Sequence, residues 1–173
     1  ALGASALRVM IMAGIVAFIL ICIFMIAYYR LPGLIACFTL TCQLALQLLV
    51  ISIPQITLTL PGIAGIILTL GMSVDANIII AERIGEELQK GLTVKSAIKK
   101  GYENSFSALF DGNLTTAIVA VILMIFGSGT MLSFGYTLLT GVIINFFAAI
   151  YISKLLLQSI VLFKLFGRQI LFR

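Results

Sequence analysis

Residues 9–29 read VMIMAGIVAFILICIFMIAYY and lie between Arg8 and Arg30. The stretch is apolar throughout and carries no charged side chain. About 20 such residues in a helix, each rising about 1.5 Å, are enough to cross the hydrocarbon core of a bilayer. The stretch therefore predicts a membrane-spanning helix with Tyr28 and Tyr29 at one membrane interface.

The composition of the whole chain agrees with this interpretation. Of its 173 residues, 62% are hydrophobic and only 10% are charged, whereas soluble domains have about 45–50% apolar and about 25% charged residues. The chain has no His, and its three Cys residues (Cys22, Cys37 and Cys42) lie in apolar runs without a CxxC pair. We therefore expect no metal site and no enzymatic activity, and we interpret the cysteines as buried apolar residues.

Four further apolar stretches predict spans at residues 34–53, 61–80, 108–126 and 132–156. Pro54 ends the second of the five spans, residues 55–59 form a tight loop, and Pro61 suits the first turn of the next helix. Residues 127–129, Gly-Ser-Gly, predict a turn. The expected fold is an all-α polytopic membrane protein with a single transmembrane domain over residues 1–173.

Most charged residues lie in the segment 82–105. We expect the third helix to extend beyond the bilayer to about residue 90, with Gly91 as its stop and Thr93 capping a short amphipathic helix. This segment is interpreted as cytoplasmic and interfacial. Residues 164–173 form a basic tail that contains Lys164, Arg168 and Arg173.

The distribution of Lys and Arg predicts the orientation in the membrane. Five spans place ten of the 11 basic residues on one face and Arg8 alone on the other. By the positive-inside rule, the N-terminus is extracytoplasmic and the C-terminus cytoplasmic. The basic residues should attract anionic lipids, but no pattern typical of nucleic-acid binding accompanies them. The odd number of spans, and a start without Met, lead us to expect a preceding segment before Ala1.

Asp75 is the one acidic residue well inside a predicted span. An Asp at the bilayer centre costs about 2.5–3.5 kcal/mol and usually marks an ion or proton route. We therefore predict that Asp75 is a proton relay, with protons as the coupling ion and no other cofactor. The alternative is an Asp that only stabilises helix packing.

Several uncharged polar residues on other spans could support Asp75. Thr39, Gln43 and Gln47 form a stripe with i, i+4, i+8 spacing on the second span. The candidate supporting residues are Gln43, Gln47, Asn113, Thr115, Thr116 and Asn145.

Five segments of the chain together resemble the membrane domain of the SecD family, bacterial protein-translocase subunits that work with SecF. They are residues 28–33 (YYRLPG), 57–65 (TLTLPGIAG), 71–77 (GMSVDAN, followed by Glu82-Arg83-Ile84), 111–116 (DGNLTT) and 126–129 (FGSG). SecF-type sequences typically carry a His-Asp pair, and this chain has no His.

The resemblance implies an arrangement of the RND superfamily, in which these spans are helices two to six of one six-helix half. It also implies a location in the bacterial inner membrane and proton-driven assistance to protein export through SecYEG. In this family the exported polypeptide is contacted by extracytoplasmic domains that precede such a segment.

The resemblance also assigns roles to individual residues. Asp75 matches the carboxylate of the family's proton path, and its accompanying Arg comes from the SecF half. Asn113 and Thr116 match the polar start of the next helix, whereas Gly112 stands where Ala or Ser is more common.

Two other functions fit the same residues. One is an RND-type exporter of small molecules or lipids, although such proteins usually carry paired Asp residues, and here Asn77 follows Asp75. The other is a membrane scaffold without transport activity, in which Asp75 only packs.

Overall fold

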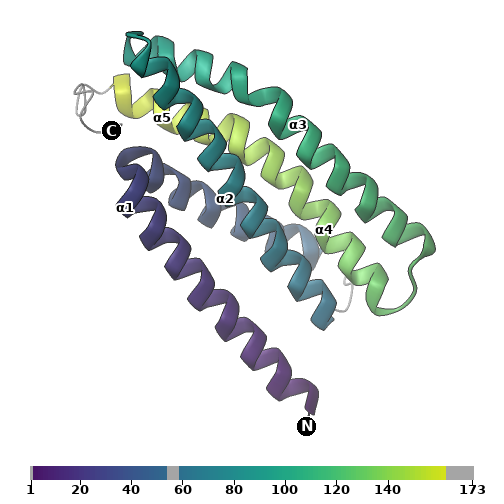
Figure 1. Cartoon of the computed structure of the whole chain (residues 1–173). Helices are drawn as coiled ribbons and strands as arrows, with labels where there is room; N and C mark the ends of the chain where they lie inside the picture. Colours follow the sequence, from purple (N-terminus) through teal and green to yellow (C-terminus); the bar gives the residue numbers. More distant parts are fainter. Residues whose placement is uncertain (1, 54–58, 163–173) are drawn as a thin grey trace.

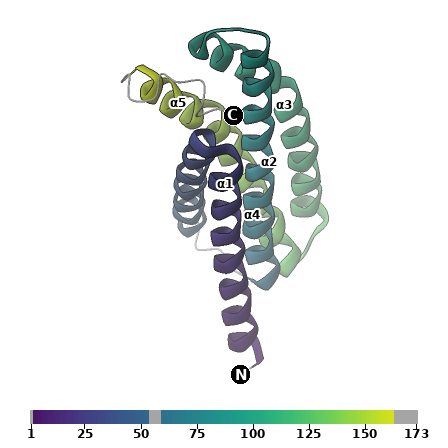
Figure 2. The same cartoon turned by 60° about the vertical axis from the view of Figure 1, so that its left-hand side comes forward.

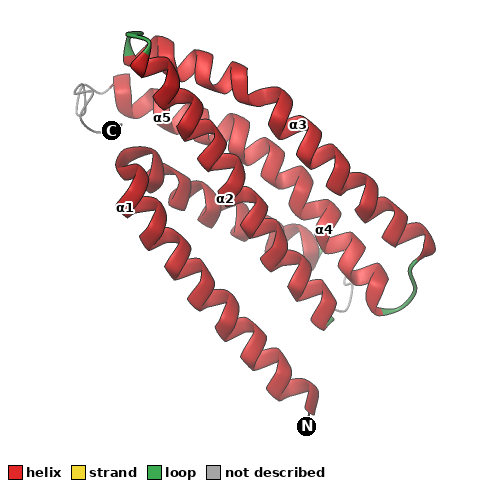
Figure 3. Cartoon of the chain, in the orientation of Figure 1, coloured by secondary structure: helices red, strands yellow, loops and turns green. Residues whose placement is uncertain are grey.

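The computed structural model describes residues 2–53 and 59–162, and within these ranges the chain is helical and contains no strand. The helices are α1 (Leu2–Ser52), α2 (Leu60–Gln89), α3 (Val94–Phe126), α4 (Thr130–Phe147), the π-helix η1 (Ala148–Ile152) and α5 (Ser153–Leu162). The prediction of an all-α fold is confirmed (Figures 1 and 3). The predicted loop at 55–59 lies almost entirely outside the described residues, and the basic tail lies wholly outside them.

Helix α1 consists of two arms that fold back on each other at Arg30 (Figure 1). Arg30 adopts φ 49° and ψ −107°, which interrupts the helix, and Pro32 follows two residues later. At Gly33 a Cβ atom would collide with the carbonyl oxygen of Met25, so this tight reversal requires glycine. Residues 2–29 are named the first arm and residues 31–52 the second arm, and they correspond to the first two predicted spans.

The number of separate helices differs from the expected number. In the described part of the chain four helices are long and apolar enough to cross a membrane, and one of them, α1, is divided at Arg30 into two arms that each correspond to one predicted span. The expected short amphipathic helix is not separate either. It is the beginning of α3, because no proline or other helix break occurs between Val94 and Phe126.

The turn between α2 and α3 follows the predicted pattern. Helix α2 ends at Gln89 and Gly91 has a φ of 86°. Thr93 occupies the N-cap position of α3, but its side chain makes no capping hydrogen bond. The fifth predicted span contains α4, the π-turn η1 and part of α5. Figure 2 shows α5 directed away from the axis of α4, a change of direction that occurs at η1.

Helix α2 is the central element of the bundle and lies against α1, α3 and α4. It approaches α4 closely, since a Cβ atom at Gly62 would lie 2.6 Å from Ser133 Oγ, and one at Gly65 would collide with Thr137 Oγ1. Large apolar side chains instead cover the outer faces of α1 and α3 and are exposed. An apolar outer surface of this kind is suited to contact with the hydrocarbon core of a bilayer.

Candidate functional site

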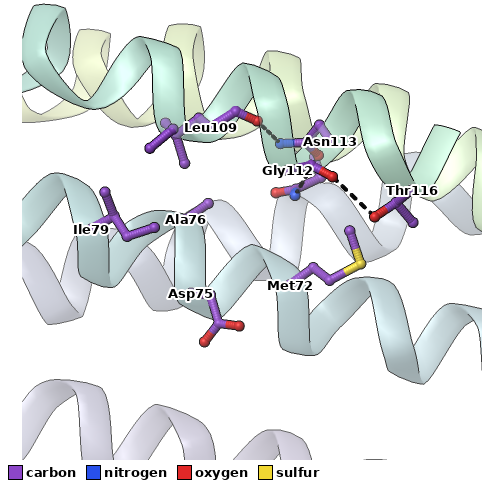
Figure 4. A pocket seen from close by; sticks show the side chains of 10 residues that line it. Met72, Asp75, Ala76, Ile79, Leu109, Gly112, Asn113 and Thr116 are labelled. Carbon is purple, nitrogen blue, oxygen red and sulfur yellow. Dashed lines mark hydrogen bonds between the residues drawn. The ribbon is translucent and has the colours of Figure 1, made fainter. Parts of the chain in front are cut away.

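Asp75 is an exposed residue on α2, at the edge of a cavity of about 260 Å³ between α2 and α3. In the view of Figure 4 its carboxyl group points away from Asn113 and from α3. Asp75 is the one acidic side chain among the residues that line the cavity. The lining residues are Met72, Asp75, Ala76, Ile79, Ala108, Leu109, Gly112, Asn113, Thr116 and Asn145.

Three of the predicted polar residues lie on this cavity: Asn113 and Thr116 on α3, and Asn145 on α4. Asn145 is 1% exposed and donates from Nδ2 to Asn113 Oδ1 at 3.2 Å. Asn113 in turn donates to the carbonyl oxygen of Leu109 at 2.7 Å, and Thr116 donates to that of Gly112 at 3.0 Å (Figure 4). The cavity therefore combines apolar walls with a small set of fixed amide and hydroxyl groups.

Thr115 and Gly112 on α3 differ in their relation to the cavity. Thr115 is exposed and donates only to the carbonyl oxygen of Asp111, so the structure does not bring it to the cavity. Gly112 lies on the cavity, and a Cβ atom there would meet nothing within 4 Å. The space that Ala or Ser would occupy is thus part of the cavity in this chain.

The two predicted glutamines are fully buried in hydrogen-bonded layers between helices. In one layer Thr69 Oγ1 donates to Gln47 Oε1 at 3.2 Å, and Gln47 Nε2 donates to the carbonyl oxygen of Thr137 at 3.1 Å. In the other layer the Ser73 hydroxyl contacts Gln43 Oε1 and also Asn145 Oδ1, the latter at 2.7 Å. The Gln43 layer therefore continues to the cavity through Asn145, whereas no residue of the Gln47 layer lines it.

Three buried residues of these layers were not predicted from the sequence: Ser73, Thr69 and Thr137. The stripe Thr69, Ser73, Asn77 repeats the i, i+4, i+8 spacing of Thr39, Gln43, Gln47, and this was the available signal. The signal is weak because Ser and Thr in apolar helices commonly bond to their own backbone. Asn77 does not face Asp75, since its amide donates to the carbonyl oxygen of Ser73.

Charged residues gather at the turn between α2 and α3. Glu87 is 3% exposed, and its Oε1 accepts from Lys90 Nζ at 2.6 Å and from Asn104 Nδ2 at 3.2 Å. The Lys90 ammonium group holds the pKa of Glu87 below its ordinary value. In the described part of the chain, no three Cys, Asp or Glu side chains lie close enough together to hold a metal ion.

Comparison with known proteins identifies the family. Residues 1–162 match the model of the family described as "Protein export membrane protein SecD/SecF, C-terminal". The chain belongs to the SecD/SecF C-terminal family. A polytopic helical membrane fold is thus shared by the structure and by the SecD/SecF family to which the chain is assigned.

Individual SecD and SecDF proteins are similar to nearly the whole chain. The protein translocase subunit SecD of Rickettsia conorii is 49% identical over 91% of this chain and 30% of its own length. SecDF of Bacillus subtilis is 45% identical over 92% of this chain and 22% of its own length.

A solved SecD/SecF-family structure has the same fold. The crystal structure of SecDF from Thermus thermophilus, a translocon-associated membrane protein, has a TM-score of 0.86 at 34% identity. It covers 90% of this chain and 22% of the SecDF chain. The chain thus spans about a third or less of the length of these relatives.

Proposed function

We propose that this chain is the membrane part of an accessory subunit, not itself an enzyme, that assists protein export through SecYEG. The subunit is driven by the proton motive force and works together with a SecF half in the bacterial inner membrane. Membership of the SecD/SecF family is the observation that carries this proposal. In this proposal the exported polypeptide is contacted by extracytoplasmic domains of the kind that the resemblance to the SecD family implies.

Asp75 is the proton relay in this proposal. It is exposed on an otherwise apolar face of α2, and an ionised carboxyl group facing lipid is unfavourable. Gly71 lies one turn before it, and a Cβ atom there would meet nothing within 4 Å. The surface around Asp75 is therefore open to a further helix, as a SecF half would supply. Protons are the coupling ion, and no other cofactor takes part.

Asn113, Thr116 and Asn145 form the polar wall of the adjoining cavity. Their amide and hydroxyl groups can bind water next to Asp75, and the cavity volume of about 260 Å³ leaves room for several molecules. Gln43 supports this wall through Ser73, while Gln47 joins the helices in the layer that does not reach the cavity. Thr115 has no part in the site.

The proposed orientation places the turn between α2 and α3 in the cytoplasm and the N-terminus outside. The exposed Lys95, Lys99 and Lys100 near that turn would then face the anionic lipids of the cytoplasmic leaflet. Export of small molecules or lipids by an RND-type exporter is the second candidate function for this fold. The absence of a second acid among the cavity-lining residues favours the protein-export function.

Export measured with and without an imposed proton gradient tests the role of Asp75. In the intact complex, Asp75→Asn should abolish the proton-dependent stimulation without affecting assembly, because the amide cannot exchange a proton. Asp75→Glu should keep part of the activity. Glu82→Gln is the matched control, since Glu82 is exposed and bonds to Tyr29 near the end of the span.

If Asp75 only stabilises helix packing, the export activities of the Asn and Glu variants should come in the opposite order. The Asn variant would then be nearly normal, and the longer Glu side chain would be the harmful change. A fully active Asp75→Asn variant would remove Asp75 from the mechanism.

A further inference from the structure

Asp111 lies in the middle part of α3, at the same level of the bundle as Asp75. Gly101 of α3 is next to Ile84 of α2, since a Cβ atom at Gly101 would lie 2.9 Å from the Ile84 nitrogen. Ten positions further along α3 is Asp111, and ten positions back along the antiparallel α2 is the residue before Asp75. The cavity agrees with this register, because Asp75 and Gly112, the neighbour of Asp111, both line it. A second helix therefore carries a carboxyl group at the depth of Asp75.

The side chain of Asp111 is directed out of the bundle. Leu109, two positions earlier, is 4% exposed, and two positions correspond to a rotation of about 200° around a helix. Asp111 is accordingly exposed, and in the described part of the chain no hydrogen bond or ion pair reaches its carboxyl group. Helix α3 itself lies at the edge of the bundle (Figures 1 and 2).

Asp111 is also too far along α3 to reach water at the cytoplasmic end. The nearest charged residue of α3 is Glu103, eight positions earlier, which is about 12 Å at helical rise. An aspartate side chain is much shorter than this distance. The Asp111 carboxyl group therefore lies at hydrocarbon depth on an outer surface.

Ser107 and Thr115 lie one turn on either side of Asp111, so three small polar residues form an exposed stripe with i, i+4, i+8 spacing. The same spacing occurs in the stripes centred on Gln43 and Ser73, and these two are buried where the second arm of α1 meets α2. Small residues let helix backbones approach closely within a membrane. The stripe on α3 thus has the composition of a helix contact, yet no helix of the described chain covers it.

Neither lipid nor a second copy of the described chain satisfies this stripe. Hydrocarbon offers no hydrogen bond to a carboxyl group, and acids within membrane segments pair with other polar groups. The basic residues of the described chain lie near the N-terminus, at the reversal of α1, around the turn between α2 and α3 or on α5, and none is at the depth of Asp111. They are Arg8, Arg30, Arg83, Lys90, Lys95, Lys99, Lys100 and Lys154.

We propose that the stripe around Asp111 is a contact site for a membrane helix of another protein, one that carries a Lys or Arg side chain at this depth. The cation pairs with the Asp111 carboxylate, and the small side chains of Ser107 and Thr115 let the two helix backbones approach. Acid and base together remove the cost of placing either charge alone in hydrocarbon. The contact belongs to α3 and does not depend on the proposed role of Asp75 on α2.

Photo-cross-linking in the intact membrane complex tests the inference. The photoreactive amino acid p-benzoylphenylalanine replaces Leu114, which lies about one turn from Asp111 and is 46% exposed. Mass spectrometry of the cross-linked peptide then identifies the attached segment. We expect a transmembrane segment of another protein with a Lys or Arg within about one helical turn of the attachment point. Attachment to lipid only, to a segment without such a residue, or to no partner at all would overturn the inference.

Variants in the cross-linking background show whether the charge matters. Asp111→Leu should lower the adduct yield about ten- to a hundredfold, the factor that corresponds to one hydrogen bond to a charged group. Asp111→Glu keeps the charge and should retain most of the yield. Glu103→Leu is the matched control, because it also removes an exposed acid from α3 but outside the apolar stretch, and it should leave the yield unchanged. An unchanged yield in Asp111→Leu, or equal losses in Asp111→Leu and Glu103→Leu, would contradict the proposal.

Exchanging the two charges distinguishes a lost ion pair from a damaged fold. Asp111→Lys alone should abolish the adduct, because it places two cations side by side. Replacing the identified basic residue of the partner by Asp in the same complex should restore the adduct, which a misfolded α3 would not allow. Failure of the exchanged pair to recover would refute the ion pair at Asp111.

Discussion

Gln47 and Thr69 face each other across the interface between the second arm of α1 and α2, and Thr69 Oγ1 donates to Gln47 Oε1 at 3.2 Å. One turn further along both helices, Gln43 meets Ser73. The sum of the two residue numbers is the same for both pairs, which defines an antiparallel register of the two polar stripes. In an apolar environment these hydrogen bonds specify which helix faces pair, because lipid and apolar side chains attract a helix surface about equally.

The Gln47 layer should contribute to stability. Gln47→Leu removes the bonds to Thr69 and Thr137, and we expect the free energy of unfolding to fall by about 0.5–2 kcal/mol. Thr41→Val is the control, because Thr41 is exposed and bonds only to its own helix. Thermal unfolding in detergent, followed by helical circular dichroism, measures both. An equal loss in the two variants would contradict a role for the layer in joining the helices.

Gly101 allows α3 to approach α2 next to the turn that joins them. A Cβ atom there would lie 2.5 Å from Ile84 Cγ1 and 2.9 Å from the backbone nitrogen of Ile84. Gly101→Ala should therefore destabilise the protein by about 1–3 kcal/mol through overpacking. Gly85→Ala, on α2 with nothing within 4 Å, should instead be neutral or gain up to about 1 kcal/mol of helix propensity. If Gly101→Ala and Gly85→Ala both lowered or both raised the melting temperature, the close contact between Gly101 and Ile84 would not be the cause.

Glu87 should make stability depend on acidic pH. Its folded-state pKa lies below the ordinary value of 4.5 because Lys90 stabilises the carboxylate. A lowered folded-state pKa stabilises the protein above the unfolded-state pKa, and this contribution is lost as the pH falls through the folded-state pKa. We expect Glu87→Gln to lower the melting temperature at pH about 7 and to reduce its further decline below pH about 4.5.

The control for Glu87 is Glu86→Gln. Glu86 pairs with Arg83 at 2.9 Å, but both side chains are about half exposed, and such pairs contribute little. Melting temperatures of the three proteins between neutral and acidic pH make the comparison. If the melting temperatures of wild type and Glu87→Gln changed with pH in parallel, Glu87 would not be the cause of the loss of stability at acidic pH.

Ser128 and Lys95 should lie on opposite sides of the membrane. Lys95 lies in the first turn of α3 and Ser128 follows its end, and the 33 residues of α3 cover about 50 Å at helical rise. In a background without the three native cysteines, Ser128→Cys should react with an impermeant thiol reagent from outside. Lys95→Cys should react only after the membrane is permeabilised. The reverse labelling pattern would overturn the proposed orientation.

The class of fold and the approximate spans follow from the amino-acid sequence alone. Long apolar runs without charge leave few alternatives to membrane helices, because each backbone polar group in lipid must be bonded within its own segment. Gly91 and Thr93 also predicted the turn between α2 and α3, since a positive φ and an N-cap are local requirements. Asp75 stood out for a similar reason, because an acid in an apolar run is costly wherever the run packs.

Which polar residues meet becomes apparent only once the helices are packed together. Ser73 looks like an ordinary small residue of an apolar helix, and its importance comes from Gln43 and Asn145, which lie 30 and 72 positions away in the chain. Thr115 and Thr116 are neighbours in sequence, yet the 100° rotation between successive helical residues directs only Thr116 to the cavity. Hydrogen bonds between helices depend on register and rotation, which arise only when the helices pack, as α2 and α4 do closely at Gly62 and Gly65.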